Sequence, residues 1–246
     1  MKSLLYKSAF NSKRSILQLC KPSTIIRTYL SSTINNFEYY EHIDSENLKY
    51  IDPINVPSTP NEKFNHKDFL IIPDFITKEE EEMLVAKSNF KLRRMRHYED
   101  SHFDGVIQNY KEVTVSDWAP FQNEVNPILE RAKSLIKDPI NWLPTHILDL
   151  GGKGGIDPHV DNIQASGDYI LGLCLLSDSV IVFKSEDYHF EVLAKARSLY
   201  MQRKTIRYNF THAIPTLPQD HKFKDVLLDK NRRISWMLRD MKPLSK

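Results

Sequence analysis

Residues 169–184 read YILGLCLLSDSVIVFK, two apolar runs separated by a short polar segment. Each run is long enough for a strand but short for a helix, and both are rich in the side chains that pack well on a pleated sheet. Turn-forming residues, Ser177-Asp178, lie between them. The stretch therefore predicts two consecutive strands with no helix between them.

Similar short runs occur on both sides of this stretch, at residues 145–150, 188–193, 198–201, 206–211 and 233–239. Polar or glycine-rich segments separate them, and we interpret one of these, Gly151–Gly155, as a flexible turn. Seven or so strands without intervening helices are typical of a sandwich or a jelly roll.

The region before residue 144 has a different pattern. Phe69–Ile72 is a strand candidate that Pro73 closes. Thr77 and Glu80 form a capping box, which predicts an amphipathic helix to about Asn89. A second helix is expected from about Asp117 to Lys137. The predicted fold class is α+β: a jelly roll with supporting N-terminal helices.

The first 29 residues contain six basic side chains, and no acid precedes Glu38. This composition, rich in Ser and Thr, is typical of a mitochondrial transit peptide. We therefore expect a transit peptide at residues 1–29, an extension at 30–66, one domain at 67–246, and a location in the mitochondrial matrix.

Composition excludes several classes of protein. Without the six N-terminal positive charges, 28 Lys and Arg residues face 32 acidic ones, a formal charge of −4. A chain with that balance lacks the general basic field of nucleic-acid-binding proteins. No apolar run approaches the ~20 residues of a transmembrane helix. Two cysteines cannot form a disulfide framework, and Cys174 lies in an apolar run as a buried thiol.

His159-Val160-Asp161 places an imidazole and a carboxylate two residues apart, on one face of an extended backbone. Two histidines and one carboxylate on one face of an octahedron leave three positions open, as iron oxygenases require. The motif is common by chance and needs a third ligand. The candidates are His146, His189, His212 and His221.

The order of motifs resembles that of the AlkB family of iron(II)- and 2-oxoglutarate-dependent dioxygenases. His-x-Asp comes first, then His212 after a predicted strand, then Arg233 and Arg239 in an RxxxxxR pattern. Segments such as 146–150, 155–159 and 172–177 are most similar to the mitochondrial subfamily numbered seven among the AlkB homologues. The resemblance extends over roughly residues 68–239.

This resemblance implies a double-stranded β-helix and a set of site residues. His159, Asp161 and His212 would bind iron(II) and act in catalysis. Arg233 would pair with the distal carboxylate of 2-oxoglutarate, since a guanidinium matches a carboxylate bidentately. Tyr200 would donate its hydroxyl to the cosubstrate, and Arg239 would line the mouth of the site.

The chain also departs from the pattern of the nucleic-acid-repairing members. Leu148 and Leu150 occupy the positions of an Asn-x-Tyr that helps to hold the cosubstrate in those members. No counterpart of their base-gripping lid is evident, and a flipped base needs compensating contacts. We therefore expect a protein or small-molecule substrate. An RNA or DNA demethylase and a non-catalytic jelly-roll interaction protein are the alternatives. The resembling subfamily also suggests a link to fatty acid metabolism and regulated necrosis.

Overall fold

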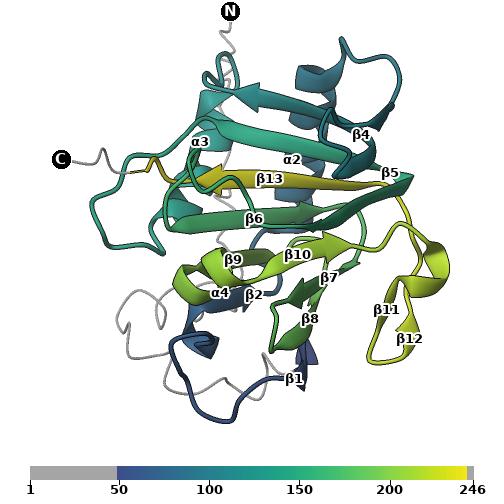
Figure 1. Cartoon of the computed structure of the whole chain (residues 1–246). Helices are drawn as coiled ribbons and strands as arrows, with labels where there is room; N and C mark the ends of the chain where they lie inside the picture. The colour runs from purple at the N-terminus through teal and green to yellow at the C-terminus, as the bar shows by residue number, and fades with distance from the viewer. Residues whose placement is uncertain (1–48, 243–246) are drawn as a thin grey trace, which may run out of the picture. The chain divides into compact units, whose positions relative to one another are not determined.

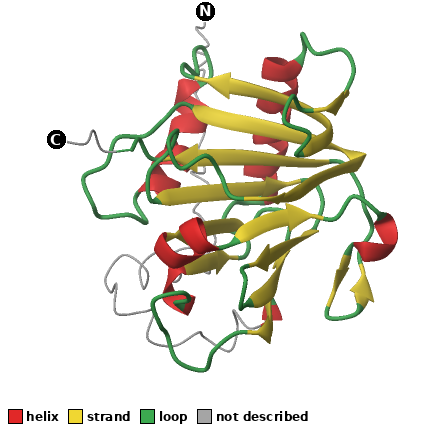
Figure 2. Ribbon diagram, in the orientation of Figure 1, coloured by secondary structure: helices red, strands yellow, loops and turns green. Residues whose placement is uncertain are grey.

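The computed structural model describes residues 49–242, so the predicted transit peptide lies outside the described residues, as does the first part of the extension. Residues 49–242 are mostly β-structure, with an 11-stranded sheet, a two-stranded hairpin and few helices (Figures 1 and 2). The strands of the large sheet are β1 (Ile51–Asn55), β2 (Phe69–Ile72), β3 (Glu99–Ser101), β4 (Ile107–Val115), β5 (Thr145–His159), β6 (Tyr169–Leu175), β7 (Ser179–Lys184), β8 (His189–Ala194), β9 (Leu199–Arg203), β10 (Thr211–Ile214) and β13 (Arg233–Arg239). The hairpin is β11 (Lys222–Phe223) and β12 (Val226–Leu227).

The large sheet curls into a half-barrel of the jelly-roll type. Its strands follow the order β1-β8-β7-β10-β5-β13-β6-β9-β2, and β3 and β4 are added beside β5. Every pairing is antiparallel. The predicted strands at 145–150, 169–184, 188–193, 198–201 and 233–239 are all present within these elements.

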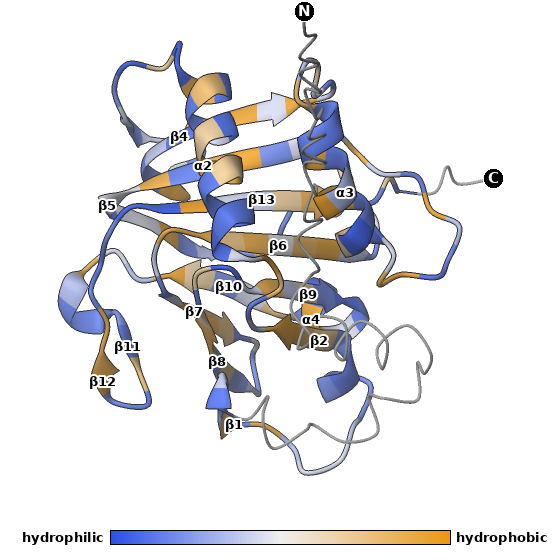
Figure 3. Cartoon of the chain, turned by 180° about the vertical axis from the view of Figure 1, so that it is seen from behind, coloured by the Kyte–Doolittle hydropathy of each residue, from blue (hydrophilic) through white to orange (hydrophobic). Residues whose placement is uncertain are grey.

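Two helices cover the outer face of the sheet, and Figure 3 shows them across its strands. They are α2 (Lys78–Leu92) and α3 (Gln122–Lys133), at the positions where the sequence predicts helices. The predicted capping box is present at α2, where the Thr77 hydroxyl and the Glu80 carboxylate each accept the other's backbone N–H. Short helical segments complete the described elements: η3 (His66–Asp68), α4 (Lys204–Asn209) and η4 (Pro218–Asp220).

Alternation along β13 separates two hydrophobic cores. Ile234, Trp236 and Leu238 face the helices, and the Trp236 indole donates to the Ser88 hydroxyl of α2 at 2.8 Å. Arg233 and Ser235 point the opposite way, into the curl of the sheet. That inner side holds the second core, in which Phe183, Phe190 and Phe210 are packed among aliphatic side chains. The polar residues of β13 are thus placed in the interior of the half-barrel.

The prediction of a strand at 206–211 is wrong, because Lys204–Asn209 forms α4 and β10 begins only at Thr211. The β-branched and aromatic residues of this stretch suggest a strand, but composition does not distinguish a short strand from a short helix. In the fold, Ile206 enters the inner core and Arg207 is buried against a loop. These tertiary contacts outweigh the local preference.

The prediction of a flexible turn at Gly151–Gly155 is also wrong. These residues lie inside β5, which runs on to His159. The pairing register between β4 and β5 shifts here, between Gln108 and Tyr110. A Cβ at Gly154 would lie 2.8 Å from the backbone oxygen of Asn109. The glycines therefore allow the close approach of β4 at this bulge.

The outer strand β1 comes from the predicted extension and pairs with β8. Phe64, from the same stretch, is buried among Phe190 and Phe210. Residues 49–66 are therefore integral to the sheet and its inner core. Between residues 49 and 242, no helix has both the length and the apolar character to cross a bilayer.

Candidate metal and cosubstrate site

The predicted metal ligands converge at the end of β5. His159 is the last residue of β5, and its register partner across the sheet is His212 of β10. Asp161 follows two residues after His159, in the loop that leaves the strand. Neighbouring antiparallel strands thus bring together side chains that are 53 positions apart in the chain.

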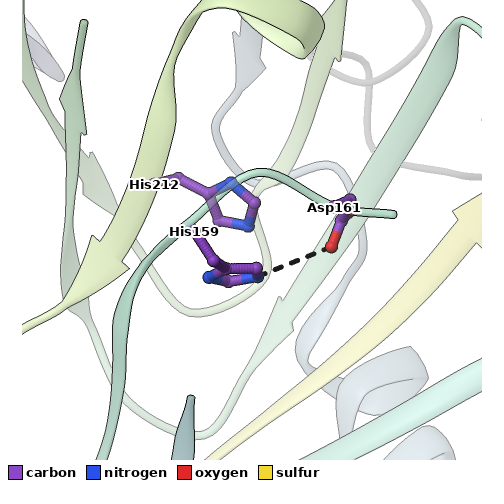
Figure 4. A group of neighbouring side chains, drawn as sticks. All are labelled: His159, Asp161 and His212. Carbon is purple, nitrogen blue, oxygen red and sulfur yellow. Dashed lines mark ion pairs between the residues drawn. The ribbon is translucent and has the colours of Figure 1, made fainter. Parts of the chain in front are cut away.

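The three side chains face one another closely (Figure 4). One potential ligand atom from each lies within 4.8 Å of the others, and no other such group of three occurs between residues 49 and 242. The two imidazole rings are 4.3 Å apart between centroids, and His159 Nε2 is 3.5 Å from Asp161 Oδ1. Of the four candidates for a third ligand, His212 is therefore the one that joins the pair.

The other three candidate histidines have different neighbours. His146 Nε2 lies 2.9 Å from the Glu112 carboxylate. His189 Nε2 lies 3.5 Å from Glu191. His221 is buried, and its Nε2 contacts the Ser179 hydroxyl at 3.1 Å.

The charges of the site suit a divalent cation. Burial alone would raise the pKa of Asp161, but Arg239 and the two histidines hold that pKa well below its ordinary value. Burial lowers the pKa of His212 to about 4, so its ring is neutral at pH 7. Burial alone would lower the pKa of His159, but its hydrogen bonds to Asp161 and to the backbone of Asp157, together with the charge of Asp161, outweigh burial and raise that pKa. A bound cation would compete with that proton.

Arg207 fixes the loop that carries Asp161. Its guanidinium is buried and donates to the backbone oxygens of Asp161 at 2.9 Å and Asn162 at 3.4 Å. It also donates to the Ser166 hydroxyl at 3.1 Å. Nothing in the sequence pattern indicates this role, since Arg207 lies in the stretch whose composition predicts a strand.

Arg239 lies beside the metal ligands. Its Nε is 3.4 Å from Asp161 Oδ2 and its Nη2 is 3.5 Å from Asp161 Oδ1. Arg239 also lines an open cleft, and its place at the mouth of a cosubstrate site stays a prediction.

Arg233 and Tyr200 lie deeper in the half-barrel, both less than a tenth exposed. Among residues 49–242, Arg233 Nε has no hydrogen-bond partner, and its Nη2 meets only the weak acceptor Cys174 Sγ, at 3.4 Å. Burial raises the pKa of Tyr200, so its hydroxyl remains a donor. That hydroxyl contacts only the sulfur of Met237, at 3.7 Å.

Two further buried polar groups share this interior and were missed by sequence reasoning. Ser235, two residues after Arg233 on β13, has an unpartnered hydroxyl. Gln202, two residues after Tyr200 on β9, has an unpartnered amide nitrogen at 1% exposure. The strand period of two, counted from Arg233 and Tyr200, was the signal that could have found them.

The residues fit the two groups that the resemblance implies. Two imidazoles and one ionised carboxylate are a donor set that suits iron(II) with open positions. A buried guanidinium without a carboxylate partner among residues 49–242 is costly unless an anion completes it. The distal carboxylate of 2-oxoglutarate has the charge and the planar geometry to do so.

An open cleft of about 510 Å³ leads to the metal ligands. Its lining includes the carboxylates of Asp104, Glu112 and Asp161 but a single guanidinium, that of Arg239, and no lysine. Apolar side chains such as Val106 and Leu143 form part of its walls. The cleft is therefore poorly suited to a polyanion.

Two known proteins are similar to this chain over 70% of its length. No protein-family model matches the chain. The alpha-ketoglutarate-dependent dioxygenase alkB homolog 7, mitochondrial, of Mus musculus is 34% identical over 177 residues, which is 70% of this chain and 78% of the relative. The Bos taurus protein of the same name is 35% identical over the same shares.

A solved structure shares the fold. It is a prolyl hydroxylase from Trichoplax adhaerens in complex with a hypoxia inducible factor peptide. The likeness has a TM-score of 0.50 at 12% identity and covers 71% of this chain and 84% of the other.

Proposed function

We propose, because this chain belongs to the AlkB family of 2-oxoglutarate-dependent dioxygenases, that His159, Asp161 and His212 bind its catalytic iron(II). The observation that supports this assignment is the convergence of the three ligand atoms within 4.8 Å. Because the chain belongs to this family, we also assign its curled sheet to the double-stranded β-helix fold.

The remaining residues hold the cosubstrate. Arg233 binds the distal carboxylate of 2-oxoglutarate. Tyr200, whose hydroxyl meets the Met237 sulfur, and Ser235, whose hydroxyl has no partner among residues 49–242, donate nearby. Arg239 stabilises the ionised form of Asp161 at the metal end. With iron and 2-oxoglutarate bound, dioxygen would be the oxidant: one oxygen atom would enter the substrate C–H bond as a hydroxyl group, and the other would enter succinate as 2-oxoglutarate loses carbon dioxide. The protein contributes ligation, orientation and exclusion of side reactions.

The substrate in this proposal is a protein or a small molecule. Besides Asp161, which ligates the metal in this proposal, the cleft is lined by the carboxylates of Asp104 and Glu112, and its guanidinium, that of Arg239, is engaged with Asp161. The alternative of an RNA or DNA demethylase needs several ionic contacts to phosphate and would make binding strongly salt-dependent.

The proposed location is the mitochondrial matrix. Both mammalian relatives carry the word mitochondrial in their names, and residues 1–29 have the composition of a transit peptide. A role in fatty acid metabolism and regulated necrosis belongs to the same proposal and rests on the subfamily resemblance.

Turnover of the cosubstrate tests the proposed activity. The purified protein with iron(II) should convert 2-oxoglutarate to succinate, slowly even without substrate, and His159→Ala should abolish this conversion. His189→Ala removes a histidine that is not one of the three proposed metal ligands, and it should leave the conversion of 2-oxoglutarate to succinate unchanged. If the protein neither forms succinate nor binds 2-oxoglutarate, the non-catalytic interaction protein is the better description.

A further inference from the structure

A row of polar contacts runs along the cleft from β4 to the metal ligands. Glu112 Oε2 of β4 lies 2.9 Å from His146 Nε2 of β5. His146 Nδ1 lies 3.2 Å from Arg239 Nη1 of β13. Arg239 in turn reaches both oxygens of Asp161, at 3.4 and 3.5 Å. Three strands and the loop after β5 thus place four side chains in series.

The chemistry of the donors fixes the direction of these contacts. A guanidinium has no acceptor, so His146 Nδ1 must accept the hydrogen bond from Arg239. A neutral imidazole that accepts through one nitrogen carries its proton on the other. His146 Nε2 therefore donates to Glu112, whose carboxylate can only accept when it is ionised.

Glu112 is also held on its other side. Its Oε1 lies 3.5 Å from His102 Nε2, and His102 Nδ1 lies 2.8 Å from Asp104 Oδ1. The His146 hydrogen bond, against a smaller opposing effect of burial, lowers the pKa of Glu112. These contacts keep the Glu112 carboxylate, which lies at the end of the row away from Asp161, ionised and in place.

Arg239 needs such an anchor. Its side chain is long, rich in rotamers and 22% exposed at the cleft. Its contacts with Asp161 are longer than an ideal charge-assisted hydrogen bond. The His146 contact fixes the guanidinium from the side that Asp161 leaves open.

We propose that Glu112 and His146 are positioning residues, which hold Arg239 against Asp161 and thereby orient the carboxylate that ligates the metal. The inference rests on the proposed function, because it takes Asp161 as a metal ligand. Partners of this kind behind a ligand typically change metal affinity by about 10- to 100-fold when they are removed.

Metal binding without turnover is the direct test, and Mn(II) is the probe. Titration of the full-length protein with Mn(II), followed by electron paramagnetic resonance, should give about ten-fold weaker binding for His146→Leu and for Glu112→Leu. Glu112→Gln keeps an oxygen that can accept from His146 and should recover most of the affinity. Thr114→Val is the matched control: Thr114 lines the same cleft on the same strand but is outside the row, and its removal should have no effect.

A double-mutant cycle separates positioning from a general structural effect. In an Arg239→Met background, His146→Leu should cause no further loss of Mn(II) affinity, because the route through Arg239 is already broken. Equal losses in both backgrounds, or an affinity of His146→Leu within two-fold of the parent protein, would overturn the proposal. Thermal melting of the metal-free variants should change little, since partly exposed pairs contribute little stability.

Asp161→Asn distinguishes failure of this inference from failure of the proposed function. If Asp161→Asn loses Mn(II) binding while His146→Leu does not, the positioning role alone is wrong. If Asp161→Asn still binds Mn(II) normally, the metal site itself is wrong, and the inference falls with it.

Discussion

Lys230 and Arg233 bring two positive charges close together near the inner end of the cosubstrate site. Both line a small pocket that also includes Asn231 and His221. Burial, and then the charge of Arg233, lowers the pKa of Lys230 to about 8. Such crowding of like charges is unfavourable in the free protein, and it is relieved when an anion binds nearby.

Lys230 should therefore destabilise the protein at neutral pH. An unfolded lysine titrates near 10.4, so between about pH 8 and pH 10.4 the unfolded state binds more protons and stability rises with pH. We expect Lys230→Met to raise the free energy of unfolding at pH 7 and to lose this advantage by about pH 10.5. Urea unfolding of both proteins at the two pH values measures the difference. Lys222→Met, which removes an exposed charge nearby, should change little at either pH.

At the scale of single residues, the sequence pointed to the candidate site residues that stand at a recognisable spacing from one another. His159 and Asp161 are two apart in an extended chain, and Arg233 and Arg239 lie at a family spacing. Arg207 and the Glu112–His146 pair have no such signature, since their partners come from distant parts of the chain. Their roles became visible only once the register of the sheet placed them.

At the scale of single elements, a glycine on strand β6 leaves room for a tyrosine side chain on the neighbouring strand β9. Gly172 of β6 is the register partner of Tyr200 on β9, and the tyrosine ring lies directly over it. A Cβ at Gly172 would lie 2.3 Å from ring atoms of Tyr200. The missing side chain thus provides the space for a residue of the cosubstrate site.

Gly172→Ala should displace the Tyr200 ring and destabilise the protein by about 1–3 kcal/mol, as overpacking typically does. Binding of 2-oxoglutarate to the manganese-loaded protein should weaken at the same time. Denaturant unfolding and calorimetric titration measure the two effects. In a Tyr200→Ala background the added methyl group has room, and the penalty should shrink. An undiminished penalty there would show that the clash involves other atoms.

Local signals predicted elements well where tertiary contacts agree with them. The Thr77–Glu80 capping box begins α2 as expected. At residues 206–211 the side chains suited a strand, yet burial of Ile206 and Arg207 requires a helix. The glycines of β5 suggested a turn from the local sequence alone. Their absent side chains leave room for Asn109 of β4, and this partner is 45 residues away from Gly154.

For the molecule as a whole, the sheet carries one core against the helices and another inside its curl. His159 and His212 of the proposed metal site belong to β5 and β10, which border the inner core, and Asp161 lies in the loop after β5. Buried groups without partners, such as Arg233 Nε and the Gln202 amide, weaken that interior until they are paired. Binding at the site should therefore stabilise the entire fold.

Mn(II) and 2-oxoglutarate together should raise the melting temperature of the protein. At a 2-oxoglutarate concentration 100 times its Kd, in metal-saturated protein, linkage predicts about 2.7 kcal/mol of additional unfolding free energy. Differential scanning calorimetry over a series of concentrations measures the gain. Asp161→Asn should show no shift with the metal. An equal shift in that variant would mean that the ligands bind elsewhere.

The pairing of β1 with β8 limits how far the chain can be shortened. Residues 51–55 satisfy the backbone groups along one side of β8, which would otherwise be free to recruit a strand from another molecule. Any processing or trimming that removes them would expose this template for aggregation, whereas cleavage near residue 29 leaves it covered. Mature forms of the enzyme should accordingly start upstream of Ile51.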